Sequence, residues 1–474
     1  MSRFNQKQET KKVENLAGGQ SYQLSNKNAL ITFLFSTFMT GKFYDTNEVD
    51  TLKKLVHKIK DKQFVAKAGI YTRNVLGMRS VSHALAGELV KSYNNLSGQE
   101  WVKYAIEKFV KRPDDITEIL AYYLQEETKI PHSLKNGLAK SFDKFNAYQL
   151  AKYKEEGKEV SLVDAIRLLN VKPNDTNREA LNKLIYGQLK SFDTWESELS
   201  KVGSDQQLKS EVWRNLLFED KIGYMALLKN LSNLIKSVPD CIGLICKKLT
   251  DRKAIKSSLV LPFRFYTAYN TIFNNVEDSK EKRRVLASLS KALDISLDNV
   301  KPLKGNTLVV LDTSGSMMSV SDKAGIFAAV LAKVNNADLM FFSYDARYVS
   351  YNPESTTMDI VDSFTYEAGG TNFSSIFRKA NKNYDNIIIL SDMQGWVRYF
   401  TPELSFKEYK RRYGANPKIY SFDLAGYGTS EFKEGGIYLL SGFSEKVFDL
   451  MEMLDKDRNA IIKEIDSIQL CDEQ

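Results

Sequence analysis

The sequence has little of what membrane, secreted and zinc-thiolate proteins carry. No apolar run approaches the roughly 20 residues of a membrane helix, and the opening residues, MSRFNQKQETKKVEN, contain no apolar signal core. Only three cysteines are present, and the spacing of Cys241 and Cys246 matches no zinc motif. We therefore expect a cytoplasmic protein without a membrane partner, whose thiols, Cys471 included, are buried or free.

Proline and glycine are also scarce, with nine and 25 among 474 residues. Together with 43% hydrophobic and 27% charged residues, this scarcity excludes a fibrous or disordered chain and indicates a well-packed one. The length exceeds what one hydrophobic core normally serves, so we expect two domains.

Charge is unevenly distributed along the chain. Residues 1–300 hold 48 Lys and Arg against 35 Asp and Glu, whereas residues 301–474 hold 19 against 24, so the two parts carry +13 and −5. A basic first part has an electrostatic reason to bind a polyanion such as nucleic acid. On charge alone, the alternative of helices that carry solvated lysines stays open.

The first part of the chain has a helical pattern. From about residue 25 to residue 300 the apolar residues recur at every third or fourth position, as in WVKYAIEKFV (101–110) and ITEILAYYL (116–124). About fifteen short helices joined by short loops favour an α-solenoid of stacked helix pairs over a single four-helix bundle.

Near residue 300 the pattern changes to alternating strands and helices. Short apolar runs rich in Val, Ile and Phe predict buried parallel strands, with helical patterns between them, and this alternation predicts an α/β doubly wound sheet. The predicted strands are TLVVLD (307–312), ADLMFFSYD (337–345), NIIILSD (386–392), KIYSFDLAG (418–426) and GIYLLSG (436–442).

The ends of these strands carry a set of oxygen ligands. Asp312 ends its strand and opens DTSGSMMS, so Asp312, Ser314 and Ser316 present one carboxylate and two hydroxyls on a tight loop. Thr371 in GGTNFSS and Asp392 at the end of a later strand should reach the same carboxyl edge, where α/β sheets bind ligands. Hard oxygen ligands suit Mg²⁺. The sequence therefore predicts a divalent cation, Mg²⁺, at this edge.

This set resembles the metal-ion-dependent adhesion site of von Willebrand factor A-like domains, in which Asp-x-Ser-x-Ser is followed by a Thr and then an Asp. The resemblance implies that Ser314, Ser316 and Thr371 bind the ion directly or through water. It also implies that Asp312 and Asp392 hold the ion, directly or through its other ligands, and that a partner's carboxylate completes the coordination.

The same loop does not have the pattern of a catalytic site. A haloacid-dehalogenase-like phosphatase would place a second Asp where this chain has Ser314, and no GxxxxGK[ST] phosphate loop occurs. The three histidines, His57, His83 and His132, all lie in the helical part. We therefore predict that the protein is not an enzyme; a metal-dependent hydrolase would need a base near Asp312.

Five stretches of the helical part carry a second resemblance. They are ENLAGGQSYQL followed by a helix ending in GKFYD, KQFVAKAGIYTRNVLGMRSVSHALAGEL (62–89), VSLVDAIRLLNVKP (160–173), KIGYMALLKNLSNL (221–234) and LPFRFYTAYN (261–270). With these stretches the helical part resembles the TROVE domain of the Ro ribonucleoprotein family. The resemblance implies a ring of HEAT-like repeats closed by the metal-site domain, with residues 1–285 as the helical domain, 286–304 as a linker and 305–474 as the von Willebrand factor A-like domain.

Members of this family bind small noncoding RNAs of the Y class on an outer basic face and admit single-stranded ends of misfolded RNAs. The resemblance therefore implies an RNA-binding scaffold of ribonucleoproteins and RNA quality control, with an exoribonuclease or another protein as a possible partner through the metal site. The alternative is a metal-dependent protein-interaction scaffold without specific RNA binding, which would hold acidic partners.

Individual RNA contacts are predicted in two segments. SFDKFNAYQLAKYK and the Lys140 directly before it are expected to form one helix that carries Lys140, Lys144, Tyr148 and Lys152 at intervals of four, a stripe that can follow phosphates and stack a base. VDAIRLLNVKP adds Arg167 and Lys172, although Asn170 stands where the family often has His. For each residue the alternative is a solvated side chain. Tyr71, Arg73, Arg79 and His83 are open to the same two interpretations.

Overall fold

The structure is a computed structural model of the chain. It describes residues 12–15, 20–23, 25–36, 46–92, 100–127, 129–153, 159–189, 198–199, 202–258, 260–367, 369–395, 401–424, 429–432, 438–441, 451 and 460–471. Several predicted features therefore lie outside the described residues: GKFYD (41–45), part of ENLAGGQSYQL and most of the helix expected after residue 442.

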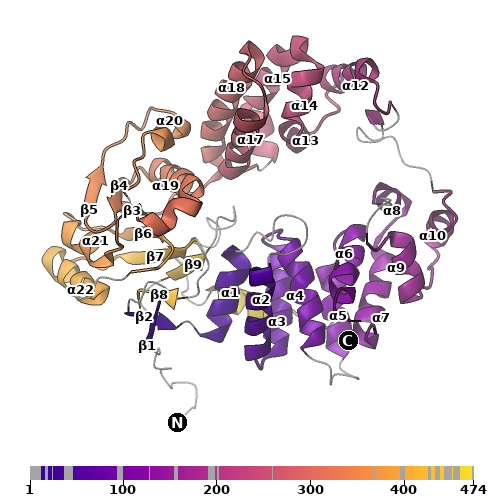
Figure 1. The fold of residues 1–474 in the computed structure, drawn as a ribbon, viewed down its shortest axis with the longest axis horizontal. Helices are drawn as coiled ribbons and strands as arrows, with labels where there is room; N and C mark the ends of the chain where they lie inside the picture. The colour runs from indigo at the N-terminus through magenta and orange to yellow at the C-terminus, as the bar shows by residue number, and fades with distance from the viewer. Residues whose placement is uncertain are drawn as a thin grey trace. The chain divides into compact units, whose positions relative to one another are not determined.

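The chain divides into two compact units (Figure 1). The first unit combines Met1–Gln23 with Asp193–Glu452, and the second combines Leu24–Phe192 with Met453–Gln474. The division by contacts does not coincide with the division by residue pattern at 286–304, because helices after residue 205 share a hydrophobic core with the α/β region.

The second unit is helical, as its apolar periodicity predicts. Its helices are amphipathic, and neighbours in the sequence pack together; α9, for example, begins at a capping box in which Ser161 and Asp164 bond each other's backbone N–H groups. Near the C-terminus, α24 returns to pack on α3, where Tyr71 Oη donates to Glu464 Oε2 at 3.1 Å. The helices are α1 (Asn26–Ser36), α2 (Thr46–Lys58), α3 (Lys62–Asn74), α4 (Ser80–Lys91), α5 (Glu100–Phe109), α6 (Pro113–Leu124), α7 (His132–Ser141), η2 (Phe142–Lys144), α8 (Ala147–Lys152), α9 (Leu162–Leu169), α10 (Arg178–Ile185) and α24 (Ala460–Ser467).

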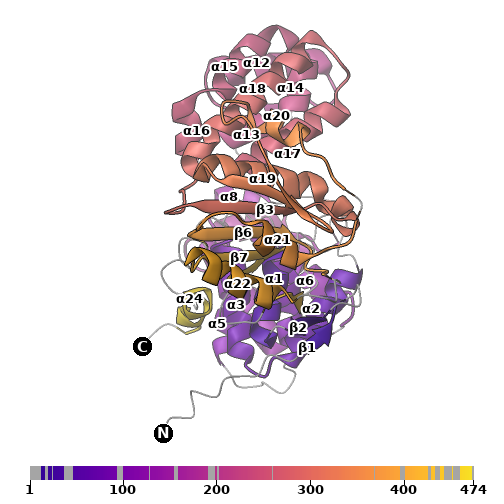
Figure 2. The same ribbon diagram turned by 90° about the vertical axis from the view of Figure 1, so that its left-hand side faces the viewer.

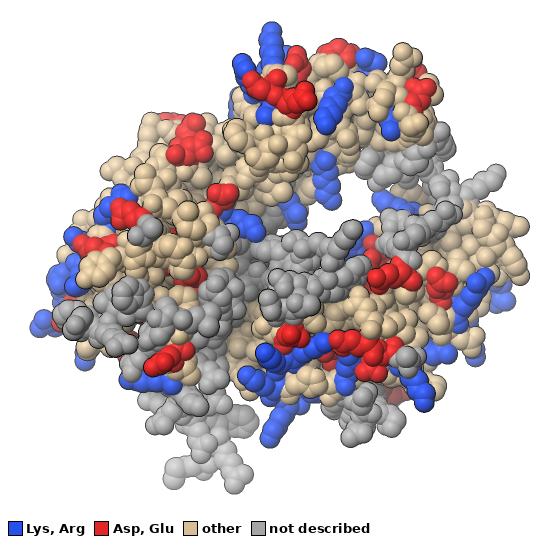
Figure 3. All heavy atoms as spheres, viewed as in Figure 1, with Lys and Arg blue, Asp and Glu red and all other residues tan. Residues whose placement is uncertain are grey.

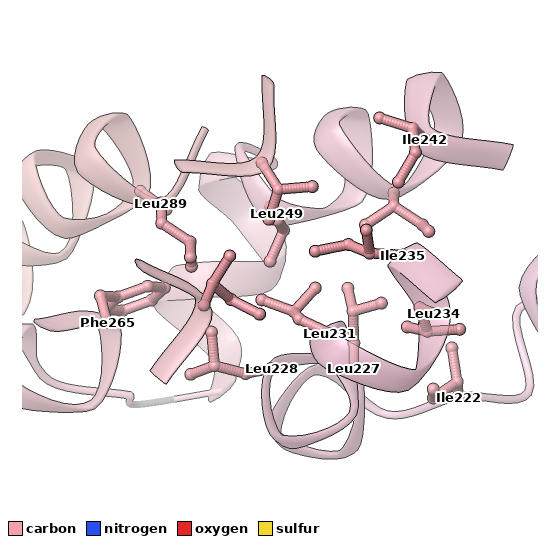
Figure 4. Close-up of a cluster of buried hydrophobic side chains, with 14 of the residues drawn as sticks. Ile222, Leu227, Leu228, Leu231, Leu234, Ile235, Ile242, Leu249, Phe265 and Leu289 are labelled. Carbon is pink, nitrogen blue, oxygen red and sulfur yellow. The ribbon is translucent and has the colours of Figure 1, made fainter. Parts of the chain in front are cut away.

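The first unit opens with a second group of short helices. Leucine and isoleucine side chains from these helices point into one interior (Figure 4), for example Leu228, Leu231 and Leu249, which come from three different helices. The helices are α12 (Gln206–Phe218), α13 (Tyr224–Lys229), α14 (Leu231–Ser237), η3 (Pro239–Cys241), α15 (Ile242–Leu249), α16 (Arg252–Ser258), α17 (Pro262–Asn275), α18 (Lys280–Ser296) and η4 (Leu297–Asn299).

A six-stranded mixed sheet forms the rest of this unit, with the strand order β5-β4-β3-β6-β7-β9. Each predicted strand is present, and β3 and β6 are buried along their whole length, as their continuous apolar sequences require. β5 was not predicted; it is a short edge strand antiparallel to β4, with a half-exposed sequence that carries no strong apolar signal. The strands are β3 (Thr307–Asp312), β4 (Asp338–Phe342), β5 (Ala346–Val349), β6 (Asn386–Ser391), β7 (Lys418–Asp423) and β9 (Tyr438–Ser441).

Helices cover both faces of this sheet. α19 (Ser321–Asn335) lies against one face and joins the core of α17 and α18, while α21 (Phe373–Lys379) and α22 (Pro402–Tyr413) lie against the other (Figure 2). α20 (Thr357–Asp362) packs beside α19. This arrangement leaves the carboxyl edge of the parallel strands open for the loops that carry the predicted metal ligands.

A small antiparallel sheet joins the N-terminal residues to this unit. β2 (Gln20–Gln23) pairs with β1 (Lys12–Glu14) on one side and with β8 (Thr429–Ser430) on the other. We call residues 12–15 and 20–23 the N-terminal strap.

Two expectations from what the sequence lacks can be compared with this structure. Cys241, Cys246 and Cys471 are free thiols, the first of them buried. Among the described residues, no helix combines the length and the apolar character that crossing a membrane requires.

Candidate metal centre and nucleic-acid interface

The loop after β3 holds Asp312 in a fixed orientation. Asp312 is fully buried; its Oδ1 accepts from Ser314 N at 2.9 Å and its Oδ2 accepts from Ser391 Oγ at 2.5 Å. The 3-10 helix η5 (Gly315–Val320) follows at once and places Ser316 Oγ 3.2 Å from Ser314 Oγ. One carboxylate and two hydroxyls therefore gather on one tight loop, as the Asp-x-Ser-x-Ser spacing predicts.

The other two loops adjoin the first. Gly315 N donates to Gly369 O at 3.4 Å, which places the loop of Thr371 directly against η5, and Thr371 itself is buried. Asp392 follows β6, which lies next to β3 in the sheet. The hydroxyl of Ser316 is near enough to its carboxyl group to offset part of the rise that burial causes in the pKa of Asp392. The structure thus brings all five predicted residues to one edge of the sheet.

The electrostatics of this edge suit a cation. Burial raises the pKa of Asp312 to about 7, and burial likewise raises the pKa of Asp392. Asp392 Oδ1 accepts from Gln394 N at 3.2 Å, whereas Asp392 Oδ2 is buried and has no hydrogen-bond partner. A buried carboxylate oxygen without a partner is costly unless a ligand satisfies it.

The donor set also fits a hard metal ion. Among the described residues no group of three or more His, Cys, Asp and Glu could hold a metal, and the set here differs because two carboxylates are joined by three hydroxyls. Such oxygen ligands suit Mg²⁺, which keeps several waters and is bound by one or two carboxylates. When bound, the ion would be held by Asp312, Ser314, Ser316, Thr371 and Asp392.

The prediction of one continuous helix across the stripe from Lys140 to Lys152 is wrong, because this segment forms separate helices. Asn146 starts a new helix by a capping box with Gln149, so residues 132–152 form α7, η2 and α8. A spacing of four therefore does not place Lys140, Lys144 and Tyr148 on one helical face. Lys140 Nζ pairs with Asp143 at 2.7 Å instead.

Lys144 is tied to the protein itself. Its Nζ donates to Glu107 O at 2.6 Å and to Val110 O at 3.3 Å, so the ammonium group caps the C-terminal end of α5. Burial lowers the pKa of Lys144, as expected for a cation that leaves water. This geometry gives Lys144 a structural role in the free protein.

The remaining predicted contacts lie at the surface of the same unit. Tyr148 is 41% exposed on α8, and Lys152 ends that helix. Arg167 is exposed in the last turn of α9, and Lys172 is exposed in the loop that follows. Asn170 caps α9 in the left-handed conformation, with φ of 53°, which Asn adopts more readily than most residues.

Comparison with known proteins identifies the family. The chain matches the TROVE domain over residues 23–187 and 186–310. The chain belongs to the TROVE family. RNA-binding protein RO60 of Deinococcus radiodurans is 22% identical over 477 residues, which cover 86% of this chain and 88% of that protein. The crystal structure of the D. radiodurans RO (RSR) protein superposes with a TM-score of 0.63 at 17% identity, over 93% of this chain and 99% of that one.

A short segment of this chain is similar to part of two larger proteins. Telomerase protein component 1 of Mus musculus is 34% identical over 87 residues, and that of Rattus norvegicus is 32% identical over 87 residues. These residues are 18% of this chain, and the chain spans only 3% of the length of either protein.

The arginines of residues 62–89, one of the segments that resemble the TROVE domain, have a structural role in this chain. Arg73, Arg79 and His83 converge on the buried Asp115, with contacts of 2.6 to 3.2 Å. Burial alone would raise the pKa of Asp115, but the hydrogen bond to His83 and the charge of Arg73 hold it well below its usual range. Tyr71 is also buried. These side chains build the interior between α3, α4 and α6.

Sequence reasoning missed three residues beside the candidate metal centre. Ser391 holds Asp312, and a Ser directly before the strand-ending Asp was a visible signal. Asn15 in the N-terminal strap donates to Gly395 O at 2.6 Å and to Glu431 Oε1 at 3.0 Å, and Glu431 Oε1 also accepts from Gly395 N at 3.2 Å. No local pattern could have paired residues 380 or more positions apart.

Proposed function

We propose that this TROVE-family protein binds small structured noncoding RNA of the Y type and the 3′ ends of misfolded RNAs, as a scaffold in ribonucleoproteins. Family membership carries the proposal, together with a relative of nearly the same length that is named as an RNA-binding protein. The net charge of +13 on residues 1–300 gives the chain the electrostatics that RNA binding requires.

The exposed basic residues of the helical unit are the proposed contacts. Lys152, Arg167 and Lys172 are exposed, and Tyr148 offers a ring on which a base could stack. The closed ring of repeats and the von Willebrand factor A-like character of the sheet stay predictions from the resemblance. An exoribonuclease partner is part of the same proposal.

A salt titration tests the proposal. Affinity for an RNA hairpin with a single-stranded 3′ tail is measured across salt concentrations for the wild type and for a variant with Lys152, Arg167 and Lys172 changed to Gln. Each lost phosphate contact should reduce the log–log slope by about 0.7 to 0.9. Failure of the wild type to bind below about 10 μM at low salt would be weaker than ordinary non-specific binding and would reject the function.

We also propose that the carboxyl edge of the sheet binds Mg²⁺ and that a partner's carboxylate completes its coordination. The unpartnered Asp392 Oδ2 supports this site. The supporting measurement is calorimetric titration with Mg²⁺ or Mn²⁺, in which the wild type should bind and an Asp312→Ala variant should not. Equal binding by both would place the ion elsewhere.

A protein-interaction scaffold is the second candidate function, and one observation favours it. Met318 on η5 and Tyr344 after β4 are 62% and 67% exposed, beside the candidate metal centre. Large exposed apolar side chains next to an open coordination position are typical of a docking site. Metal-dependent capture of an acidic protein without RNA affinity would favour this function over RNA binding.

A further inference from the structure

A basic surface lies at the edge of the sheet where the parallel strands begin, although the net charge of residues 301–474 is negative. Residues 301–474 carry 19 Lys and Arg against 24 Asp and Glu, but residues 373–418 alone carry nine against four. This segment is therefore +5, and the rest of the domain, with ten against 20, is −10. Basic side chains lie over α21 and α22 at the left margin of Figure 3.

The fold gathers these cations at one place. α21 leads into β6 and α22 leads into β7, so both helices end at the amino edge, opposite the candidate metal centre. Tyr409 joins α22 to the segment between α21 and β6: its Oη donates to Lys382 O at 2.9 Å and accepts from Tyr384 N at 3.0 Å. Phe377 of α21 packs on Phe406 of α22, with ring centroids 5.0 Å apart.

The cations of α22 have no ion pair among the described residues. In α21 and the turn after it, Lys379 pairs with Asp345 at 3.4 Å and Lys382 with Asp338 at 2.7 Å. For α22, by contrast, the described part of the chain provides no ion pair to four cations within six residues, and three of the four are exposed. These are Lys407, Lys410, Arg411 and Arg412, which we call the α22 cluster.

Helix stability accounts for part of the α22 cluster. Cations in a last turn are favoured by the helix dipole, which covers Lys410, Arg411 and Arg412. Lys407 and Arg411 stand four residues apart and repel by about 0.2–0.5 kcal/mol, and Glu403 and Glu408, four residues before Lys407 and Arg412, offset repulsion of this size. What helix stability leaves unexplained is that Lys407, Arg411 and Arg412 are exposed without an ion pair among the described residues, which leaves them accessible to an anionic ligand.

The spread of the charges indicates which anion. Lys407 and Arg412 are separated by five residues, or about 7 Å along a helix axis, and Lys379 and Lys382 extend the surface onto the neighbouring helix end. A single phosphate cannot satisfy so wide a set, whereas successive phosphates of a nucleic-acid strand can. Phe406, with Lys410 Nζ 4.9 Å from its ring centroid, and half-buried Tyr413 add aromatic rings.

We propose that the α22 cluster is a second RNA-binding surface, located on the α/β region rather than on the helical repeats. The proposal rests on the proposed RNA-binding function and extends it to a domain whose net charge is negative. The α22 cluster would then supply phosphate contacts in addition to those proposed for the helical unit.

Matched charge variants test the proposal. Arg411→Gln with Arg412→Gln removes two charges from the cluster, and Lys323→Gln with Arg347→Gln removes two from the same domain but outside it. With the tailed RNA hairpin, the cluster variant should show a log–log salt slope smaller by about 1.4 than that of the wild type. Raising the salt from 50 to 200 mM should therefore weaken RNA binding about sevenfold less in the variant than in the wild type. The control variant should keep the wild-type slope. Thermal unfolding checks that both variants fold.

The possible failures are distinguishable. A wild type that binds no RNA rejects the proposed function and this surface with it. A wild type that binds RNA, with equal slopes for both variants, rejects only the α22 cluster. A third variant that combines the cluster changes with Lys152→Gln and Arg167→Gln should show additive slope losses if one RNA contacts both surfaces. Loss of binding to an acidic protein but not to RNA would assign the cluster to a different partner class.

Discussion

Changing Asn15 to Ala should weaken both the stability of the first unit and its affinity for metal. Asn15 is buried in the N-terminal strap, and its amide donates to Gly395 O and to Glu431 Oε1. Without it the Gly395 carbonyl loses the donor at 2.6 Å, and Glu431 keeps Gly395 N. A buried acceptor left unsatisfied costs about 1–3 kcal/mol, so we expect a loss of about 2 kcal/mol.

The same change should reach the candidate metal ligand Asp392, three residues before Gly395. Between them, Met393 adopts a left-handed backbone with φ of 58°, a conformation that costs a residue with a side chain about 1–2 kcal/mol. Its side chain is buried in the core, and Gly395 is held by the strap. If about 1.4 kcal/mol of this support is lost, affinity for the ion falls about tenfold.

Calorimetric titration with Mn²⁺ and urea unfolding measure the two effects. Hydrogen exchange at the Gly395 amide reports the loop directly and should accelerate in the Asn15→Ala variant. Asn416→Ala is the matched control, because Asn416 is exposed on the same unit. Wild-type Mn²⁺ affinity together with slow exchange at Gly395 in the variant would refute the reasoning, whereas a wild type that binds no Mn²⁺ would reject the metal centre itself.

Three further predictions concern buried carboxylates. Burial raises the pKa of Glu431 to about 8, so the stability it supports is present at low pH and is lost as pH rises through 8; Glu431→Gln should reduce the fall in urea midpoint between pH 6 and 9. Asp392→Asn should abolish Mn²⁺ binding in calorimetry, yet unfold in EDTA at no lower temperature than the wild type, because it removes a buried charge whose Oδ2 has no hydrogen-bond partner among the described residues. Asp115→Ala should destabilise the helical unit by about 3–5 kcal/mol in urea unfolding, whereas Glu179→Gln, which breaks an exposed pair, should change little.

Patterns within short sequence segments were sufficient to predict much of this structure. TLVVLD and NIIILS each have an unbroken apolar run of four residues, which predicts central strands, and the polar residues at their carboxyl ends were therefore expected to meet at one edge. β5 was missed because an edge strand with two half-exposed residues lacks such a pattern. The helix around Lys144 was misjudged because one capping residue, Asn146, outweighs a regular spacing of lysines.

Features that depend on the tertiary fold could not be predicted in this way. The pairing of Asn15 with Glu431 joins residues 416 positions apart, and neither residue type is unusual at its place in the sequence. The α22 cluster is a local run of the sequence, KEYKRR, whose charge was averaged into a domain of net charge −5. The parallel crossover adds what the sequence does not show, because it brings the neighbouring helix end, with Lys379 and Lys382, to the same edge.

The joint between α18 and the α/β region explains why contacts and sequence pattern divide the chain differently. Asp294 of α18 accepts from Lys333 Nζ at 2.9 Å and from Thr357 Oγ1 at 2.6 Å. Ile326 and Val330 of α19 belong to the same buried cluster as the helices from α12 onward. A cut at 286–304 would expose this apolar surface and leave Asp294 without its partners. The sheet, the candidate metal centre and the α22 cluster therefore belong to the same compact unit as the second group of helices.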